Sequence, residues 1–170
     1  MIYNMNVLLE AAPIKDMLKT KERDHGVSYG LGEAGYDIRI KQEILFSPKN
    51  NFVTSNWIQD GEKYGSFNDG NFTIASAIEE FQMPDKLVGV VHDKSTCAGK
   101  GLSVFNTVIK SVWNGFLTLE LVYHGQENLR IPAGAGIAQV IFDEVSVPNS
   151  YDGKYQNQED RPVDAIMERG

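Results

Sequence analysis

The sequence predicts a mainly β domain, an all-β barrel or sandwich, and three observations lead to that class. Short apolar segments recur between residues 36 and 145, and several alternate with the period of two that is typical of strands. Turns rich in Gly, Asn and Pro separate them, as at Asn68-Asp69-Gly70. This succession of brief strands and turns favours an all-β architecture over alternating βαβ units.

The elements of the first half follow in order. Ile14, Met17 and Leu18 come at helical spacing after Pro13 and predict one short amphipathic helix. The remaining segments predict strands, and their residues are Tyr36–Ile40, Ile44–Phe46, Phe52–Val53 and Phe72–Phe81.

The strand of most interest is Phe116–Tyr123. Its pleat places Leu117, Leu119 and Leu121 on one face, so Glu120 projects from the opposite face and away from the core. Glu120 in this position is a candidate general base, although a strand glutamate more often simply faces water.

Further along, Pro132-Ala133-Gly134-Ala135-Gly136 is the nearest approach to a glycine-rich phosphate loop. We interpret it instead as the turn of a hairpin between Leu129–Ile131 and Ile137–Phe142, because glycine commonly serves strand connections.

The chain divides into a β domain over residues 1–150, which includes the short N-terminal helical segment, and a polar tail over 151–170. The tail is too poor in aliphatic residues to pack a core of its own. It is either disordered or a segment that orders over a ligand or a neighbouring subunit.

Composition excludes several functions. The 170 residues fit one domain, and the formal charge of −7 argues against non-specific binding of nucleic acid. Cys97 is the single cysteine, and His25, His92 and His124 are scattered, so the signature of a zinc deaminase is absent. No apolar run has the length of a membrane span and no signal peptide opens the chain, so we expect a cytoplasmic protein without membrane contacts.

Lys94-Ser95-Thr96 forms a second candidate site. A cation, two hydroxyls and the free N–H groups of a short helix beginning there could bind an oxyanion. The alternative is a helix N-cap with a solvated lysine, since Ser and Thr are preferred caps.

Five segments of the chain together resemble a known family. They are AGYDIRI, ASAIEEFQMPDKLVGVVHDKSTCAGKGL, GFLTLELVYHG, IPAGAGIAQVIFDEV and YDGKYQNQ, in this order between about residues 33 and 163. Their succession is similar to that of the dCTP deaminases, in the dCTP deaminase and dUTPase superfamily. The resemblance implies a distorted β-barrel or β-clip of the dUTPase-like kind with a few short helices, assembled as a homotrimer whose active sites are shared between subunits.

The resemblance also implies an activity, the zinc-independent hydrolysis of dCTP, or a related deoxycytidine nucleotide, to dUTP and ammonia. Glu120 matches the carboxylate that activates water, and Ser95 is the second residue expected in catalysis. Mg²⁺ is expected as cofactor, bound through the nucleotide phosphates, with no metal site of the protein's own. The expected substrate-binding residues are Lys94, Ser95, Thr96, Lys100, Asn106, Gln139, Tyr151, Lys154 and Gln158.

Two departures from the family pattern bear on this expectation. Gly99 replaces an active-site arginine, with Lys100 beside it, and lysine lacks the bidentate fork of arginine. Ser111-Val112 replaces Pro-Gly, which predicts a changed loop, and Lys110 reverses an acidic charge. The alternatives are therefore a dUTP pyrophosphatase, a bifunctional enzyme that forms dUMP, or a catalytically silent homologue that binds dCTP, dUTP or dTTP.

Overall fold

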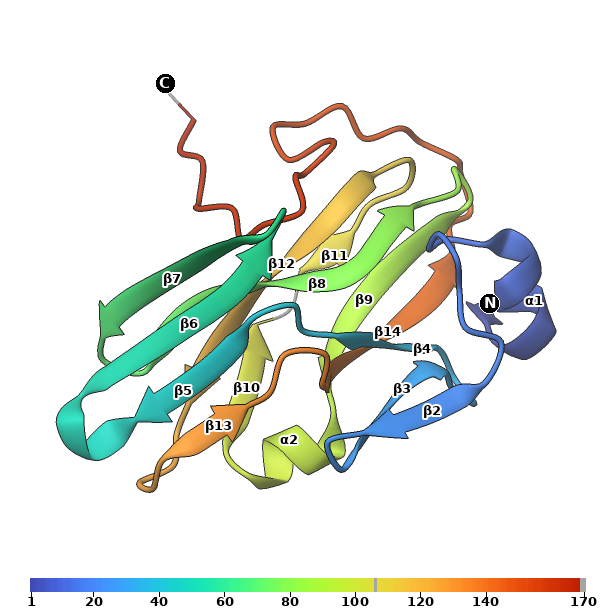
Figure 1. Cartoon of the computed structure of the whole chain (residues 1–170). Coiled ribbons are helices and arrows are strands. Elements are labelled where there is room, and N and C mark those ends of the chain that lie inside the picture. The colour runs from blue at the N-terminus through green and yellow to red at the C-terminus, as the bar shows by residue number, and fades with distance from the viewer. Residues whose placement is uncertain (106, 169–170) are drawn as a thin grey trace.

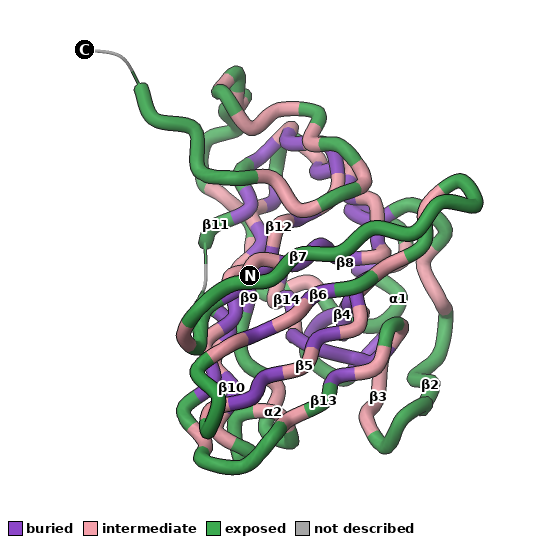
Figure 2. The backbone as a smooth tube through the Cα atoms, turned by 60° about the vertical axis from the view of Figure 1, so that its left-hand side comes forward, coloured by how far each residue is buried: buried purple, intermediate pink, exposed green. Residues whose placement is uncertain are grey.

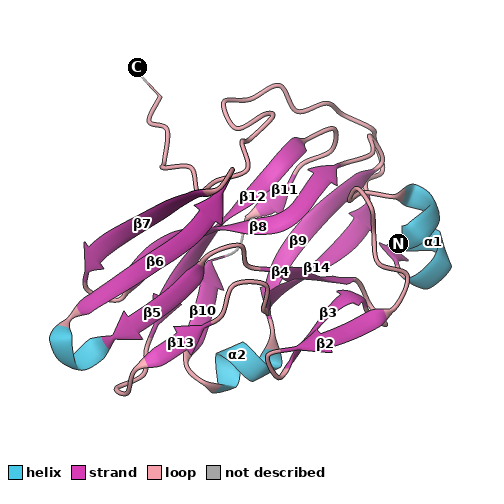
Figure 3. Ribbon diagram, in the orientation of Figure 1, coloured by secondary structure: helices cyan, strands magenta, loops and turns pink. Residues whose placement is uncertain are grey.

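The computed structural model describes residues 1–105 and 107–168. Strands dominate it, and the helices are short: α1 (Met5–Ala11), α2 (Ser95–Gly99) and a 3-10 turn, η1 (Pro48–Asn50) (Figure 3). The mainly β class is confirmed. None of the helices in the described ranges has the length and apolar character needed to cross a bilayer.

The described strands form three sheets that stay open instead of closing into one barrel (Figure 1). In the first, the order is β11 (Val108–Ile109), β9 (Leu87–Asp93), β14 (Gly136–Glu144), β4 (Tyr36–Arg39), β3 (Val27–Leu31) and β2 (Lys21–Asp24), with β1 (Ile2–Tyr3) also on β14. The second has β10 (Leu102–Phe105), β12 (Asn114–Tyr123) and β8 (Phe72–Gln82). The third has β13 (Leu129–Ile131), β5 (Glu43–Ser47), β6 (Phe52–Gln59) and β7 (Glu62–Asp69).

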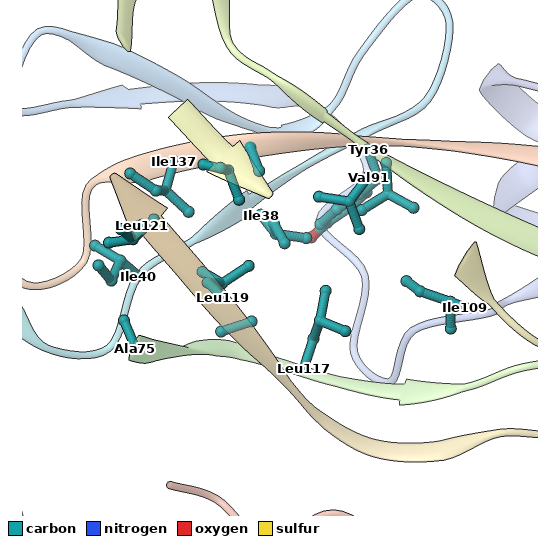
Figure 4. Packing of buried hydrophobic residues seen from close by; sticks show 14 of the residues in the cluster. Tyr36, Ile38, Ile40, Ala75, Val91, Ile109, Leu117, Leu119, Leu121 and Ile137 are labelled. Atoms are coloured by element: carbon teal, nitrogen blue, oxygen red, sulfur yellow. The ribbon is translucent and has the colours of Figure 1, made fainter. Parts of the chain in front are cut away.

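The core is one cluster of buried side chains to which all three sheets contribute. Leu117, Leu119 and Leu121 of β12 are buried, as their alternation predicts, and they face Ile38 of β4 and Ile137 of β14 (Figure 4). Burying aliphatic side chains on both sheets removes their apolar surface from water, which is the main stabilising contribution to such a fold. β7, in contrast, is exposed along its whole length (Figure 2).

The predicted N-terminal helix is misplaced. The helix is α1, which ends at Ala11 before Pro13, and Ala12 adopts the left-handed conformation of a helix C-terminus. Ile14, expected on that helix, instead bridges to Phe81 of β8 and is buried. Its apolar spacing therefore reflects contact with a sheet.

The hairpin predicted at Pro132–Gly136 is also wrong. The N–H of Ala135 donates to the carbonyl of Pro132 to close a turn, but the flanking strands do not pair with each other. β13 pairs with β5 and β14 pairs with β4 and β9, so the turn carries the chain from one sheet to another. Bonds between this turn and the two backbone groups of Ile40 hold it at that crossing.

Candidate active site

A cavity of about 560 Å³ opens beside β12. Its floor comes from β8, β11 and β12, and its cover from the C-terminal segment, which Figure 1 shows as the orange-to-red trace above β12. Apolar atoms make up most of its exposed lining, and polar side chains also reach it, as is usual for a small-molecule site. The polar lining residues are Thr107, Lys110, Thr118, Glu120, Tyr151, Tyr155, Gln158 and Asp164.

Glu120 lies in the floor of this cavity because β12 is the central strand of its sheet. Its neighbours across the two ladders are Ile74 of β8 and Phe105 of β10. The carboxylate is half-buried, and burial among these side chains raises the pKa of Glu120, while a backbone hydrogen bond lowers it by less. A carboxylate with a raised pKa is a stronger base, so the position suits proton transfer.

The cover is attached to β12 through its polar face. Gly115 and Gln158 form a parallel bridge, and the N–H of Phe116 donates to the carbonyl of Gln158 at 3.0 Å. The Thr118 hydroxyl accepts hydrogen bonds from the Gln158 side chain at 3.3 Å and from the Val163 N–H at 3.1 Å. The C-terminal segment, for which the sequence allows either disorder or ordering over a ligand or a neighbouring subunit, therefore packs on its own chain.

The loop at residues 110–113 keeps a turn despite the loss of Pro-Gly. The Trp113 N–H donates to the carbonyl of Lys110 at 3.2 Å, and Val112 adopts φ = 63°, the left-handed region that a glycine would normally occupy. The replacement of Pro-Gly by Ser111-Val112 therefore does not remove the turn from this loop. Lys110 extends from it, with its ammonium 4.9 Å from the ring centre of Tyr151.

Lys94 is held in a buried ion pair. Its ammonium contacts the Asp37 carboxylate and donates to the Ser28 hydroxyl at 3.1 Å, and the exposed fractions of the Lys94 and Asp37 side chains are 10% and 3%. Gln139, another expected substrate-binding residue, donates to the second oxygen of Asp37 at 3.2 Å. The N-cap of α2 is Lys94, without a side-chain capping hydrogen bond, whereas one interpretation expected Ser or Thr as the cap and a solvated lysine. The lysine is neither solvated nor a free cation.

The other residues of the second candidate site are exposed on α2. Ser95 is its first residue, and Thr96 and Lys100 line a small separate cavity of about 60 Å³ beside β13 and Gly136. Within one described chain, these residues do not line the Glu120 cavity. The single chain therefore brings together one part of the predicted site, Glu120 with Tyr151 and Gln158, and leaves Lys94, Ser95, Thr96, Lys100 and Gln139 apart from it.

Two further expected residues complete the set. Lys154 lies outside the cavity lining, with its ammonium 5.3 Å from the ring centre of Tyr155 and 3.5 Å from a carboxylate oxygen of Glu168. Asn106 falls outside the described residues.

Several lining residues were not in the predicted set, and the sequence carried a signal for some of them. Thr118 is two residues from Glu120 on the same strand face, so alternation alone places it beside the carboxylate. Phe72 and Ile74 line the cavity because β8 pairs with β12 in a register that the sequence does not reveal. Tyr155 and Val163 line the cavity only because the C-terminal segment folds back onto β12.

Comparison with known proteins identifies the family of this chain. The family model described as dCTP deaminase-like matches residues 8–145. A dCTP deaminase of Roseiflexus castenholzii is 32% identical over 163 residues, covering 88% of this chain and 88% of the relative. One of Helicobacter pylori is 37% identical over 147 residues, covering 78% of each.

Among solved structures, the dUTPase of Staphylococcus bacteriophage 80alpha has a similar fold. The TM-score is 0.51 at 16% identity, over 83% of this chain and 94% of the phage chain. The chain belongs to the dCTP deaminase-like family of nucleotide-modifying enzymes.

Proposed function

We propose that the protein hydrolyses the 4-amino group of dCTP to give dUTP and ammonia, with Glu120 as the base that activates water. One observation carries the proposal: a half-buried carboxylate with a raised pKa projects into a cavity of about 560 Å³ in a chain of this family. The relatives named above are dCTP deaminases. A cavity of this size accommodates a nucleoside, and half of its lining residues are apolar.

The proposed reaction needs one proton acceptor that later becomes a donor. Glu120 takes a proton from water as the water oxygen bonds to C4 and the N3=C4 double bond opens, and it returns that proton to N3. It then takes the proton of the new C4 hydroxyl and passes it to the amino nitrogen. The C4–N bond breaks, ammonia leaves, and the carbonyl of the uracil ring forms. A carboxyl group whose pKa is raised towards neutrality can both accept and return the proton.

For the triphosphate we expect the hydroxyls of Ser95 and Thr96, with Lys100 and Lys154, to supply contacts. Since the residues of α2 lie away from the Glu120 cavity within one chain, a complete site requires a second copy, which agrees with the expected homotrimer. Mg²⁺ is expected to arrive on the phosphate oxygens and to neutralise their charge. Among the described residues, no three His, Cys, Asp or Glu side chains gather in a way that could hold a metal ion.

A homologue that binds nucleotide without turnover is the second candidate, and the Lys94 ion pair favours it. The family's first arginine of this motif is here a lysine whose charge is already neutralised by Asp37, and the second is Gly99. Both changes remove positive charge that would otherwise face phosphate. A dUTP pyrophosphatase, acting alone or after deamination, is the third candidate.

One set of incubations separates these candidates. The purified protein is incubated with dCTP or dUTP and Mg²⁺, and ammonia, pyrophosphate and nucleotides are quantified. Deamination predicts ammonia and dUTP from dCTP. Glu120→Gln is expected to reduce turnover by about 10²- to 10⁴-fold, while calorimetry still detects nucleotide binding.

Glu127→Gln serves as the matched control, because Glu127 pairs with Lys49 on the surface outside the cavity and the substitution is chemically identical. Normal turnover by Glu120→Gln would overturn the assigned mechanism. Tight binding without product identifies a silent homologue, and pyrophosphate released from dUTP identifies the third candidate.

A further inference from the structure

The turn Lys110–Trp113 carries a conformational cost. Val112 has φ = 63°, and a β-branched residue is rarely found in this left-handed region because its side chain crowds the backbone. A free turn of this sequence would relax away from that conformation by on the order of 10-fold in population. Some other part of the protein must therefore hold Val112 in place.

The side chain of Gln156, in the C-terminal segment, makes the contacts that do so. Its Oε1 accepts a hydrogen bond from the N–H of Asn114 at 2.8 Å, and its Nε2 donates to the carbonyl of Val112 at 2.8 Å. The same Nε2 donates to the carbonyl of Tyr151 at 3.1 Å. One amide group thus joins both sides of Trp113 to the C-terminal segment.

Neighbouring bonds bind the two segments further. The indole N–H of Trp113 donates to the carbonyl of Tyr155 at 2.6 Å, and the Tyr151 N–H donates to the carbonyl of Ser111 at 3.2 Å. Every residue from Ser111 to Asn114 therefore has a hydrogen bond to the segment that covers the cavity.

The conformation of this turn decides where Lys110 stands. Lys110 begins the turn, and its ammonium lies over the ring of Tyr151. It lines the Glu120 cavity and also the shallow groove beside it, which Ser150 and Asp152 line as well. No ion pair with the described residues neutralises it, so its charge is available to a ligand in the cavity.

We propose that Gln156 is a positioning residue, whose side-chain amide clamps the Lys110–Trp113 turn so that closing of the C-terminal segment and placement of Lys110 at the cavity are one coupled step. The proposal deepens the function proposed above, since a charge placed by closure contributes to nucleotide binding only in the closed form. The coupling follows from the contacts: without Gln156 the Val112 carbonyl keeps only the longer hydrogen bond from the Asn114 side-chain amide, at 3.2 Å, and loses its bond to the C-terminal segment, so Val112 relaxes.

Hydrogen exchange followed by NMR tests the clamp directly. The Asn114 amide reports the bond to Gln156, and the Trp113 backbone amide reports closure of the turn on Lys110. The indole proton of Trp113 reports docking of the segment, and Trp57→Phe assigns it, since the chain has two tryptophans.

For Gln156→Ala we expect exchange of the Asn114 and Trp113 backbone amides to rise at least 10-fold. Gln156→Glu keeps an acceptor for Asn114 but cannot donate to the Val112 carbonyl, so we expect it to release the Trp113 amide as well. In the double variant Val112→Gly/Gln156→Ala, glycine tolerates the left-handed turn, so protection should return at Trp113 but not at Asn114.

Asp152→Asn is the matched control, an exposed position in the same segment, and it should leave exchange at all three sites unchanged. An unchanged Trp113 amide in Gln156→Ala would overturn the proposal, because the turn would then hold itself. So would a double variant that restores nothing. These readouts need no turnover, so a failure of the proposed deamination would leave them intact and distinguishable.

Discussion

Replacing Lys94 by Met tests whether this lysine is a structural ion-pair partner or a ligand for phosphate. The substitution keeps the length and apolar stem of the side chain and removes the charge. Asp37 would then remain in the core as a carboxylate without its cation, with an exposed fraction of 3%. Removing one partner of a buried pair is costly because the other stays charged and desolvated.

The contacts around Asp37 set the size of the effect. Breaking a buried pair typically costs about 3–5 kcal/mol. Asp37 keeps two neutral donors, the hydroxyl of Ser28 and the amide of Gln139, each at 3.2 Å, and each contributes on the order of 1 kcal/mol. We therefore expect Lys94→Met to lower the free energy of unfolding by about 1–3 kcal/mol.

The assay is urea unfolding at fixed protein concentration, at low and at high salt. Lys100→Met is the control, since Lys100 is exposed at the end of the same helix and should change stability by no more than about 0.5 kcal/mol. Adding Asp37→Asn to Lys94→Met should recover part of the loss, because no buried charge then remains. A buried pair is weakly screened, so salt should change these differences little.

A loss below about 1 kcal/mol, or one that disappears at high salt, would refute this reasoning and would return Lys94 to the set of free cations. The double variant also has a functional use. If it folds and binds dCTP as tightly as the unaltered protein, the charge of Lys94 does not contact phosphate.

Three other perturbations have defined outcomes. Because burial raises the pKa of Glu120 in the folded protein, its ionised form lowers stability above that pKa and not below about pH 4.5. Glu120→Gln should therefore raise Tm by a few degrees at neutral pH and not in acid, at roughly 2–4 °C per kcal/mol. The acidic limb of any pH–rate profile should lie above the ordinary glutamate pKa. A Glu120→Gln variant with an unchanged or lower Tm at pH 7 would contradict the assigned burial. Gly115→Ala should detach the C-terminal segment, since the new Cβ would lie 2.5 Å from the Gln158 nitrogen and the φ of Gly115 is +128°. Limited proteolysis should then cut residues 151–165 at least 10-fold faster than in the unaltered protein, while Tm falls by only a few degrees. Equal cleavage rates in the two proteins would count against docking of the segment on β12. Leu119→Ala, at a position 1% exposed, should cost about 2–5 kcal/mol in urea unfolding, and a smaller loss would mean that the core between the sheets collapses around the gap.

The features that depend on a single strand were predicted from local periodicity. The alternation of Leu117, Leu119 and Leu121 assigned β12, its buried face and the outward side of Glu120, and all three assignments match the structure. Such patterns succeed because the pleat and the burial of one face are decided by nearest neighbours in sequence.

What depends on pairing between distant segments could not be predicted. The apolar spacing at Ile14, Met17 and Leu18 fits a helix, but Ile14 pairs with a strand 67 positions away at Phe81. The turn at Pro132–Gly136 has the residues of a hairpin, yet its flanks join different sheets, since turn chemistry does not specify which strand becomes the partner.

The candidate site shows the same division. Glu120 and the neighbouring Thr118 follow from one strand, whereas the partner of Lys94 is Asp37, a residue on another strand. The polar composition of residues 151–168 gave no sign that Gln156 and Gln158 would bond to β12 and the preceding turn. Amide side chains look solvent-exposed in a sequence, but here they satisfy backbone groups that would otherwise lack partners.

The C-terminal segment contributes to the surroundings of Glu120. Tyr155, Gln158 and Val163 line the same cavity as its carboxylate, and burial is what raises the pKa of that group. Under the proposed function, opening of the segment would admit water and lower the pKa of Glu120 towards that of an ordinary glutamate. The carboxylate would then be a stronger base in the closed molecule than in the open one.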